Sequence, residues 1–186
     1  ANPQVLDEAL AQGEKFLEQF PDHLLIIGVK PTYPEPGYGY IECAQEIFPG
    51  VREVYAFREK PNQDTAAEYM ASGRHLWNAG LFAWKVWAIA ERIRSLAPEH
   101  APILDAESDD ELKIAYDHVP PVAIDYAIFE KDDRLAVIPA SLDWRDIGHW
   151  TAVKKHLQQS PNENVIKGRH IGVDTENCLI INKADR

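Results

Sequence analysis

The chain has 186 residues, of which 45% are hydrophobic, and it carries a formal net charge of −11 with a pI near 5.0. This length and apolar content suffice for one domain with a real core and the start of a second, and they exclude a disordered chain. The acidic balance argues against a nucleic-acid-binding protein, which needs a basic face. It does not exclude a nucleotide, which needs only a local positive site.

The cysteines and the N-terminal segment bear on the cellular compartment. Cys43 and Cys178 show neither the spacing of a zinc site nor a disulfide framework, so we expect two small buried residues in a reducing compartment. No basic region followed by an apolar block opens the sequence, and no apolar run approaches the roughly 18 residues that span a bilayer. The sequence therefore predicts a soluble, cytoplasmic protein with no membrane or nucleic-acid partner.

Hydrophobic periodicity predicts alternating helices and strands at the start of the chain. Helical spacing indicates an amphipathic helix over residues 4–20, and a continuous apolar run indicates a strand over 24–29 that is buried on both faces. Residues 51–57 are expected to form a strand, followed by a helix that is capped by Asp64 or Thr65 and ends at Gly73. This order is typical of an open α/β sheet, which binds ligands beyond the carboxyl ends of its strands.

The later elements belong to the same domain until a polar, proline-containing linker at residues 160–164. We expect strands at 76–84 and 135–138 and helical segments at 86–96, 99–119 and 124–131. A last helix is expected to end at residue 157. Beyond the linker, apolar pieces at 165–166, 171–173 and 178–181 predict two or three short strands of a separate all-β unit. We therefore expect two domains, at residues 1–160 and 161–186.

The loop over residues 30–39 and the pair Glu59-Lys60 form the first candidate site. Three prolines fix φ in this loop, and Gly37 and Gly39 leave the backbone bare for the close approach of a ligand. Glu59 offers acceptors for sugar hydroxyls, and Lys60 offers a cation for a phosphate. A tight turn followed by a solvated charge pair is the alternative interpretation.

Three further polar residues each allow a structural and a functional interpretation. Asn78 is either a turn or bulge residue or an amide that contacts a polar ligand. Asp125 is either a first-turn charge of its short helix or a site residue. Asp146 is either a cap of the following helix or, beside Gly148 at a strand-to-helix turn, a ligand of hydrated Mg²⁺.

These residues fall within five motifs that occur in a familiar order and spacing. They are Gly28-Val29-Lys30-Pro31-Thr32-Tyr33-Pro34-Glu35 with Gly37-Tyr38-Gly39-Tyr40-Ile41, Glu59-Lys60-Pro61, Trp77-Asn78-Ala79-Gly80, Ile124-Asp125-Tyr126-Ala127, and Trp144-Arg145-Asp146-Ile147-Gly148-His149-Trp150. Each motif alone is weak, but together they are specific and extend over nearly the whole chain. The sequence resembles the mannose-1-phosphate guanylyltransferases, the sugar nucleotidyltransferases that make GDP-mannose.

The resemblance implies a fold, a reaction and a set of site residues. The fold is a Rossmann-like α/β nucleotidyltransferase domain, present here in part, followed by the start of a C-terminal left-handed β-helix. The reaction forms GDP-mannose and pyrophosphate from GTP and mannose-1-phosphate with Mg²⁺. The resemblance assigns catalysis to Lys60 and Asp146, with Asp146 as metal ligand, and substrate binding to Tyr38, Gly39, Glu59, Lys60, Asn78 and Asp125.

The sequence also departs from the family pattern. Pro36 replaces a more usual Thr, Ala123 replaces a frequent Ser, and Arg145 and His149 vary the surroundings of Asp146. The glycine-rich loop that cradles the triphosphate in the family, and a second metal-binding Asp, do not occur here. We therefore expect this chain to represent the C-terminal part of a catalytic domain and to be inactive by itself.

Alternative functions remain open from the sequence. One is a non-catalytic sugar-phosphate-binding or assembly module of the same ancestry, and another is a sugar-1-phosphate nucleotidyltransferase of other specificity. Because many relatives associate through their β-helix, a homo-oligomer is a further expectation of the resemblance.

Overall fold

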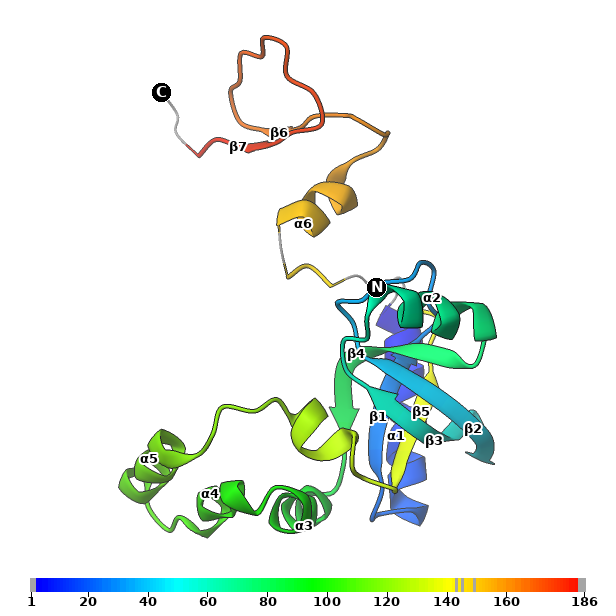
Figure 1. The fold of residues 1–186 in the computed structure, drawn as a ribbon, viewed down its shortest axis with the longest axis vertical. Coiled ribbons are helices and arrows are strands. Elements are labelled where there is room, and N and C mark those ends of the chain that lie inside the picture. The colour runs from blue at the N-terminus through cyan, green and yellow to red at the C-terminus, as the bar shows by residue number, and fades with distance from the viewer. Residues whose placement is uncertain (1–2, 143, 145, 149, 184–186) are drawn as a thin grey trace. The chain divides into compact units, whose positions relative to one another are not determined.

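The computed structural model describes residues 3–142, 144, 146–148 and 150–183. The chain packs as two compact units, residues 1–143 and 144–186 (Figure 1). This division lies before the helix that ends at Leu157, whereas the domain boundary expected from the sequence lies after it, at residue 160. Within the described residues, no helix is both long and apolar enough to cross a membrane.

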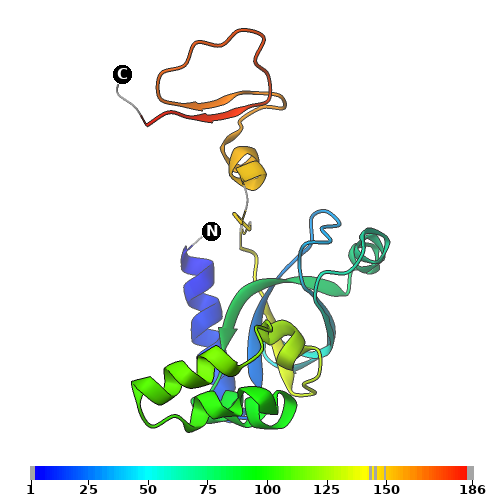
Figure 2. The same cartoon turned by 60° about the vertical axis from the view of Figure 1, so that its left-hand side comes forward.

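The first unit is built on five strands: β1 (Leu24–Val29), β2 (Tyr40–Phe48), β3 (Val51–Arg58), β4 (His75–Ala83) and β5 (Leu135–Pro139). Their order is β1-β4-β2-β3-β5, and because β5 pairs with both β1 and β3, the sheet closes on itself (Figure 2). The expectation of an open sheet is therefore wrong, although the α/β class holds. Among the five strands described in the first unit, only β1 and β5 pair in parallel, so their carboxyl ends meet at one edge.

Helices follow or precede most of these strands. They are α1 (Pro3–Gln19), α2 (Gln63–Ser72), α3 (Val86–Leu96), the 3₁₀ helix η1 (Pro98–His100), α4 (Ala101–Asp105), α5 (Asp109–His118) and the π-helix η2 (Asp125–Phe129). The helices expected over 4–20, 86–96 and 124–131 are confirmed. The cap expected at Asp64 or Thr65 is wrong, because the Asn62 side chain accepts from the Thr65 N–H at 2.9 Å. Gly73 ends α2 in the left-handed conformation, as predicted.

The core lies between the sheet and the helices. All six residues of β1 are buried, as the continuous apolar run predicts. α1 lies along β1 (Figure 2), and Gly13 permits this approach, because an added Cβ would meet a Leu25 methyl carbon at 2.7 Å. The buried face of η2 joins the same core, where Phe129 contacts Phe57 and Phe82 at ring-centroid distances of 5.6 and 4.9 Å.

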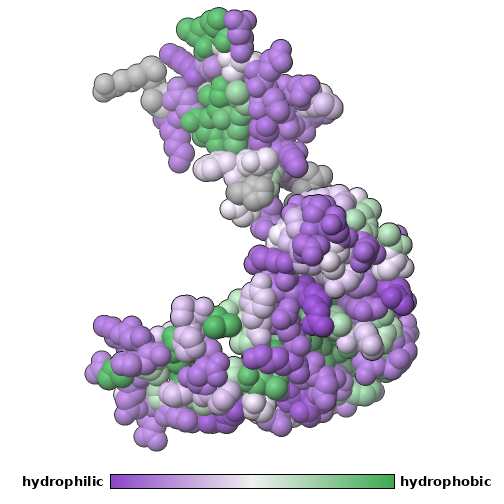
Figure 3. Space-filling view, viewed as in Figure 1, coloured by the Kyte–Doolittle hydropathy of each residue, from purple (hydrophilic) through white to green (hydrophobic). Residues whose placement is uncertain are grey.

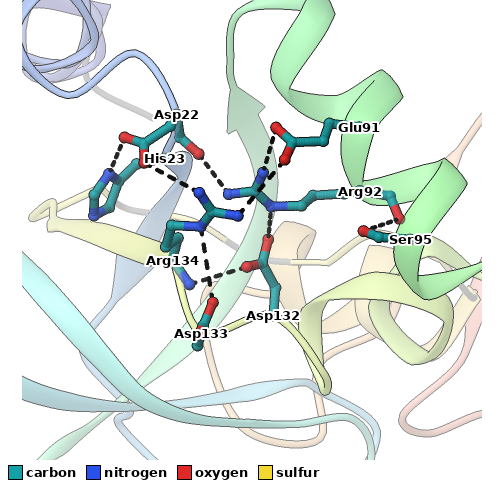
Figure 4. A network of polar contacts seen from close by, with 8 residues as sticks. All are labelled: Asp22, His23, Glu91, Arg92, Ser95, Asp132, Asp133 and Arg134. Atoms are coloured by element: carbon teal, nitrogen blue, oxygen red, sulfur yellow. Dashed lines mark hydrogen bonds and ion pairs between the residues drawn. The ribbon is translucent and has the colours of Figure 1, made fainter.

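A buried ion pair ties α3 to the segment before β5 (Figure 4). Arg92 Nε donates to Asp132 Oδ2 at 2.9 Å, and each side chain is only 2% exposed. Arg92 Nη2 also donates to the carbonyl oxygen of Asp22, just before β1, at 2.7 Å. Asp132 Oδ1 accepts the Arg134 backbone N–H. Three chain segments are therefore joined at the end of the sheet where β1 and β5 begin.

The second unit contains α6 (Trp150–Leu157), β6 (Val165–Lys167) and β7 (Leu179–Ile181). The two strands pair in parallel, and Lys154 of α6 donates to Asn177 shortly before β7. Residues 171–173, a candidate third strand, form no strand. Hydrophobic side chains gather over the two strands in Figure 3. Cys178 here and Cys43 in the first unit are free and only partly buried, so the expectation of two buried cysteines is wrong.

Candidate sugar-phosphate site

The loop between β1 and β2 is held by aromatic contacts. The rings of Tyr33 and Tyr38 both meet Trp77 edge-on, at centroid distances of 5.0 and 5.1 Å, and their hydroxyl oxygens lie 3.4 Å apart. The Tyr40 hydroxyl accepts the Glu35 backbone N–H at 3.0 Å. These contacts give the defined loop that the prolines and glycines predict, and they show that the Tyr38 ring packs on Trp77.

Gly39 lies where this loop enters β2, and the side on which a Cβ would stand faces the side chains of Glu59 and Asn78. A Cβ at this position would lie 2.5 Å from Glu59 Oε2, 3.1 Å from a Phe57 ring carbon and 3.2 Å from Asn78 Cβ. The Gly39 carbonyl accepts the Asn78 backbone N–H at 2.8 Å. The missing side chain therefore makes room for the carboxylate of Glu59 and for Asn78, two residues that the sequence singles out.

Glu59 and Lys60 follow β3 directly. Lys60 Nζ lies 2.9 Å from Glu59 Oε1, and the Glu59 side chain is 9% exposed against 58% for Lys60. The carboxylate is thus not part of a solvated charge pair, which was the alternative interpretation. The hydrogen bond and charge of Glu59, with smaller contributions from Tyr126 and Asp125, raise the pKa of Lys60 above its usual 10.5. The ammonium therefore stays charged at neutral pH.

The backbone at Lys60 has an uncommon conformation. Its φ of +47° lies in the left-handed region, which a side chain with a Cβ adopts at a cost in free energy. Two hydrogen bonds fix this turn: the Lys60 N–H donates to the Tyr38 carbonyl at 3.2 Å, and the Glu59 N–H donates to Glu130 Oε1 at 3.0 Å. In this conformation the exposed ammonium lies against the Glu59 carboxylate.

Asn78 combines the two interpretations that the sequence leaves open. The pairing of β1 with β4 shifts register between Ile26 and Gly28, and Gly80 has a φ of +69°, so the strand is irregular here. The side-chain amide is also engaged: Nδ2 donates to Asp125 Oδ1 at 3.0 Å, and Oδ1 accepts the Gly80 N–H at 2.9 Å. Asp125 opens η2, so it is both a first-turn residue and a member of this cluster.

The structure thus brings together five sequence-predicted site residues from four segments of the first unit: Gly39, Glu59, Lys60, Asn78 and Asp125. Tyr38 joins them through its backbone carbonyl. Glu130 belongs to the same cluster through its bond to Glu59, and the sequence analysis missed it. Its only sequence signal is its place five residues after Asp125, which becomes informative once the turn between them is known to be a π-helix.

Asp146 lies in the second unit and is exposed. A Cβ on Gly148 would meet its Oδ1 at 3.2 Å, so the glycine keeps the space beside the carboxylate open. Because α6 begins only at Trp150, Asp146 does not occupy the position directly before the helix, and a simple cap is disfavoured. The two varied neighbours, Arg145 and His149, lie outside the described residues.

A magnesium ion is compatible with this donor chemistry. Within the described residues, no group of three or more His, Cys, Asp or Glu side chains is arranged to hold a metal. Mg²⁺ is usually held by one or two carboxylates together with substrate phosphates rather than by a cage of protein ligands. A single exposed carboxylate such as Asp146 fits that requirement.

The cluster in the first unit has the chemistry of a sugar-phosphate site. Carboxylate and amide groups provide acceptors and donors for hydroxyls, and one exposed ammonium provides charge for a phosphate. Set on an α/β domain, this arrangement is a candidate binding site for a phosphorylated sugar.

Comparison with known proteins identifies the family. Residues 5–162 match the family model described as nucleotidyl transferase, so the chain belongs to the nucleotidyl transferase family. The mannose-1-phosphate guanylyltransferase of Sinorhizobium fredii is 34% identical over 167 residues, which cover 85% of this chain and 33% of the relative. The alginate biosynthesis protein AlgA of Pseudomonas putida is 32% identical over 188 residues, covering 95% of this chain and 38% of the relative. The chain thus spans 33% and 38% of the length of these two curated relatives.

Solved structures agree with the family. A crystal structure described as mannose-1-phosphate geranyltransferase from Thermus thermophilus matches with a TM-score of 0.80 and 31% identity, covering 97% of this chain and 56% of that one. A mannose-6-phosphate isomerase from Helicobacter pylori matches with a TM-score of 0.63 at 21% identity, which supports the fold alone. The resemblance seen in the sequence motifs is confirmed, and so is the nucleotidyltransferase-like α/β fold.

Proposed function

We propose that the protein containing this chain makes GDP-mannose and pyrophosphate from GTP and mannose-1-phosphate. The observation that carries the proposal is a cluster in which Glu59 and Asn78 lie beside the position of the missing Gly39 Cβ and Lys60 pairs with Glu59. The names of the relatives support mannose-1-phosphate as the sugar substrate. GTP enters the proposal through the guanylyltransferase activity that those names state.

The proposed roles follow from the contacts. Glu59, largely buried, accepts hydrogen bonds from sugar hydroxyls, and the Asn78 amide donates through the Nδ2 hydrogen that is not directed at Asp125. Lys60, mostly exposed and charged at neutral pH, pairs with the sugar phosphate. The phosphate oxygen that attacks the α-phosphorus of GTP is already ionised, so positioning and charge neutralisation are sufficient and no strong general base is needed.

We also propose Asp146 as the carboxylate that this chain contributes to Mg²⁺. The ion, when bound, neutralises phosphate charge during transfer to the nucleophile. In the same proposal, the parallel strands β6 and β7 are the beginning of a left-handed β-helix, because parallel pairing of short strands separated by a loop is how each turn of such a helix joins the next.

A comparison of substrates in separate assays tests the proposed reaction. Pyrophosphate release is measured for the whole protein with GTP, ATP, UTP and dTTP, each with mannose-1-phosphate and with glucose-1-phosphate. We expect GTP with mannose-1-phosphate to give the highest kcat/KM. A preference for UTP or dTTP with glucose-1-phosphate would overturn the assignment. Sugar-phosphate binding without any turnover would instead establish the non-catalytic module as the function.

A further inference from the structure

Two carboxylates lie at the ends of the π-helix η2: Asp125 begins it and Glu130 follows it directly. Glu130 donates its backbone N–H to the carbonyl of Asp125 at 3.0 Å, the hydrogen bond from residue i+5 to residue i that defines a π turn. In an α-helix, residues five apart lie about 140° away from each other around the axis. The wider turn instead stacks Glu130 over Asp125, so both side chains extend toward the same part of the molecule.

Each carboxylate holds a different segment of the site. Asp125 Oδ1 accepts from the Asn78 side chain in β4, and Glu130 Oε1 accepts from the Glu59 backbone after β3, both at 3.0 Å. These strands are not neighbours, because β2 lies between them in the sheet. β2 pairs with both, with Tyr40 opposite Arg58 of β3 and Trp77 of β4, and the bonds to Asp125 and Glu130 add a second link between Glu59 and Asn78.

The π-helix itself is fixed without these carboxylates. Phe129 and Ile128 are 1% and 2% exposed, and Phe129 packs on Phe57 and Phe82 in the core. Asp125 and Glu130 are only partly buried. The buried apolar face therefore anchors η2, and the polar face is left available to position the residues of the site.

We propose that Asp125 and Glu130 are a pair of positioning residues, spaced by the π-helix, that hold Asn78 and Glu59 in register for the sugar phosphate. The inference rests on the proposed function for its substrate. Asp125, together with the Gly80 N–H that bonds to Asn78 Oδ1, fixes the amide so that Asn78 presents a donor. Glu130 fixes the backbone that leads into the left-handed conformation of Lys60, and so the placement of the Glu59–Lys60 ion pair.

The test separates the acceptor of Glu130 from its bulk. Glu130→Ala removes the acceptor for the Glu59 N–H, whereas Glu130→Gln keeps an oxygen in its place. Asp133→Ala is the control, because that carboxylate is 93% exposed and lies in the same part of the chain. Amide hydrogen exchange of Glu59 is measured by NMR, and steady-state kinetics of the whole protein give KM separately for sugar phosphate and nucleotide.

We expect Glu130→Ala to speed exchange of the Glu59 amide by about tenfold or more, since a hydrogen bond to a charged group is lost. We also expect it to raise the KM for mannose-1-phosphate by about tenfold, with the KM for nucleotide unchanged. Glu130→Gln should restore most of both, and Asp133→Ala should change neither.

Several results would overturn the inference. Unchanged exchange of the Glu59 amide in Glu130→Ala would show that the carboxylate does not hold this backbone. Equal kinetic losses in the Ala and Gln variants, or equal rises in both KM values, would show a general structural role. If the whole protein turns over no sugar phosphate, the proposed function fails, and with it the substrate role assigned to the pair. The exchange experiment then still decides whether Glu130 holds Glu59.

Discussion

Replacing Arg92 by Met should cause the largest loss of stability among single ionic residues of the first unit that the structure describes. The guanidinium and the Asp132 carboxylate are each 2% exposed and lie 2.9 Å apart (Figure 4). Removal of one partner leaves a buried charge without compensation, which costs about 3–5 kcal/mol. The Asp22 carbonyl also loses its donor at 2.7 Å. Against a typical total stability of about 5–15 kcal/mol, this change brings the domain close to unfolding.

Urea unfolding followed by tryptophan fluorescence measures this cost. Arg94→Met is the matched control, because Arg94 lies on the same helix and pairs with Asp105 at 2.6 Å, but both groups are exposed. We expect a large drop in the urea midpoint for Arg92→Met and little change for the control. In the double variant Arg92→Met with Asp132→Asn, the loss should be smaller than the sum of the single losses, because the unpaired charge is gone.

Two outcomes of these unfolding experiments would contradict the prediction for Arg92→Met. If Arg92→Met and Arg94→Met lower the midpoint equally, burial of the pair does not determine its contribution. If the double variant is as destabilised as the sum of both single changes, the two side chains do not interact in the folded protein, and the network of Figure 4 is not what joins α3 to the sheet.

Three further predictions concern the site and its surroundings. Gly39→Ala should raise the KM for sugar phosphate by about tenfold or more, because the new Cβ displaces the Glu59 carboxylate, whereas Gly37→Ala should have little effect; steady-state kinetics compare the two. Asp146→Asn should lower kcat by about 10²–10³, as loss of one group that stabilises transferring charge does, with circular dichroism unchanged. Burial outweighs the opposing charge of Glu42 and lowers the pKa of His75 below its usual 6.5, so stability should fall as the pH drops through 6.5 and urea midpoints should record it.

Each of these has a contrary outcome. Equal kinetic effects of the two glycine variants would mean that close packing at Gly39 is not needed. Turnover of Asp146→Asn like that of the parent at low Mg²⁺ would remove Asp146 from the metal site. The unfolded state binds a proton at His75 more readily than the folded state does. The pH dependence of the urea midpoint must therefore be lost in His75→Gln. It must be kept in His118→Gln, which changes an exposed histidine.

The sequence predicts those elements whose pattern is local and misses those that depend on pairing. β1 is predicted with its observed bounds because its six residues are apolar and buried without interruption. β2 is missed because its pairing with β3 shifts register three times, and its outer residues are polar, so no alternation develops. The parallel pairing of β1 with β5, which closes the sheet, joins segments that are far apart in sequence and leaves no local signal.

In the site, too, residues with a local sequence signal are predicted, and a residue whose role depends on tertiary structure is missed. Glu59, Lys60 and Asn78 are found in the sequence as polar residues at the end or an irregularity of apolar strands, and Asp125 as a charge in the first turn of a short helix. Glu130 is not, because its role depends on a π turn that hydrophobic periodicity does not distinguish from an α-helix. Of the two residues proposed to position the site, Asp125 is therefore found from the sequence and Glu130 only from the structure.

In the proposed function, the ion pair between Glu59 and Lys60 lets one site serve both ends of a sugar phosphate. Without ligand, the ammonium satisfies a carboxylate that is 9% exposed and would otherwise be costly to bury. A bound sugar phosphate brings hydroxyl donors for Glu59 and a dianion for Lys60, so each partner of the ion pair gains a contact of matching chemistry. The proposed exchange keeps the buried carboxylate satisfied in both states. A neutral sugar lacks the phosphate that draws the ammonium away, so on this proposal we expect the site to prefer the phosphorylated sugar.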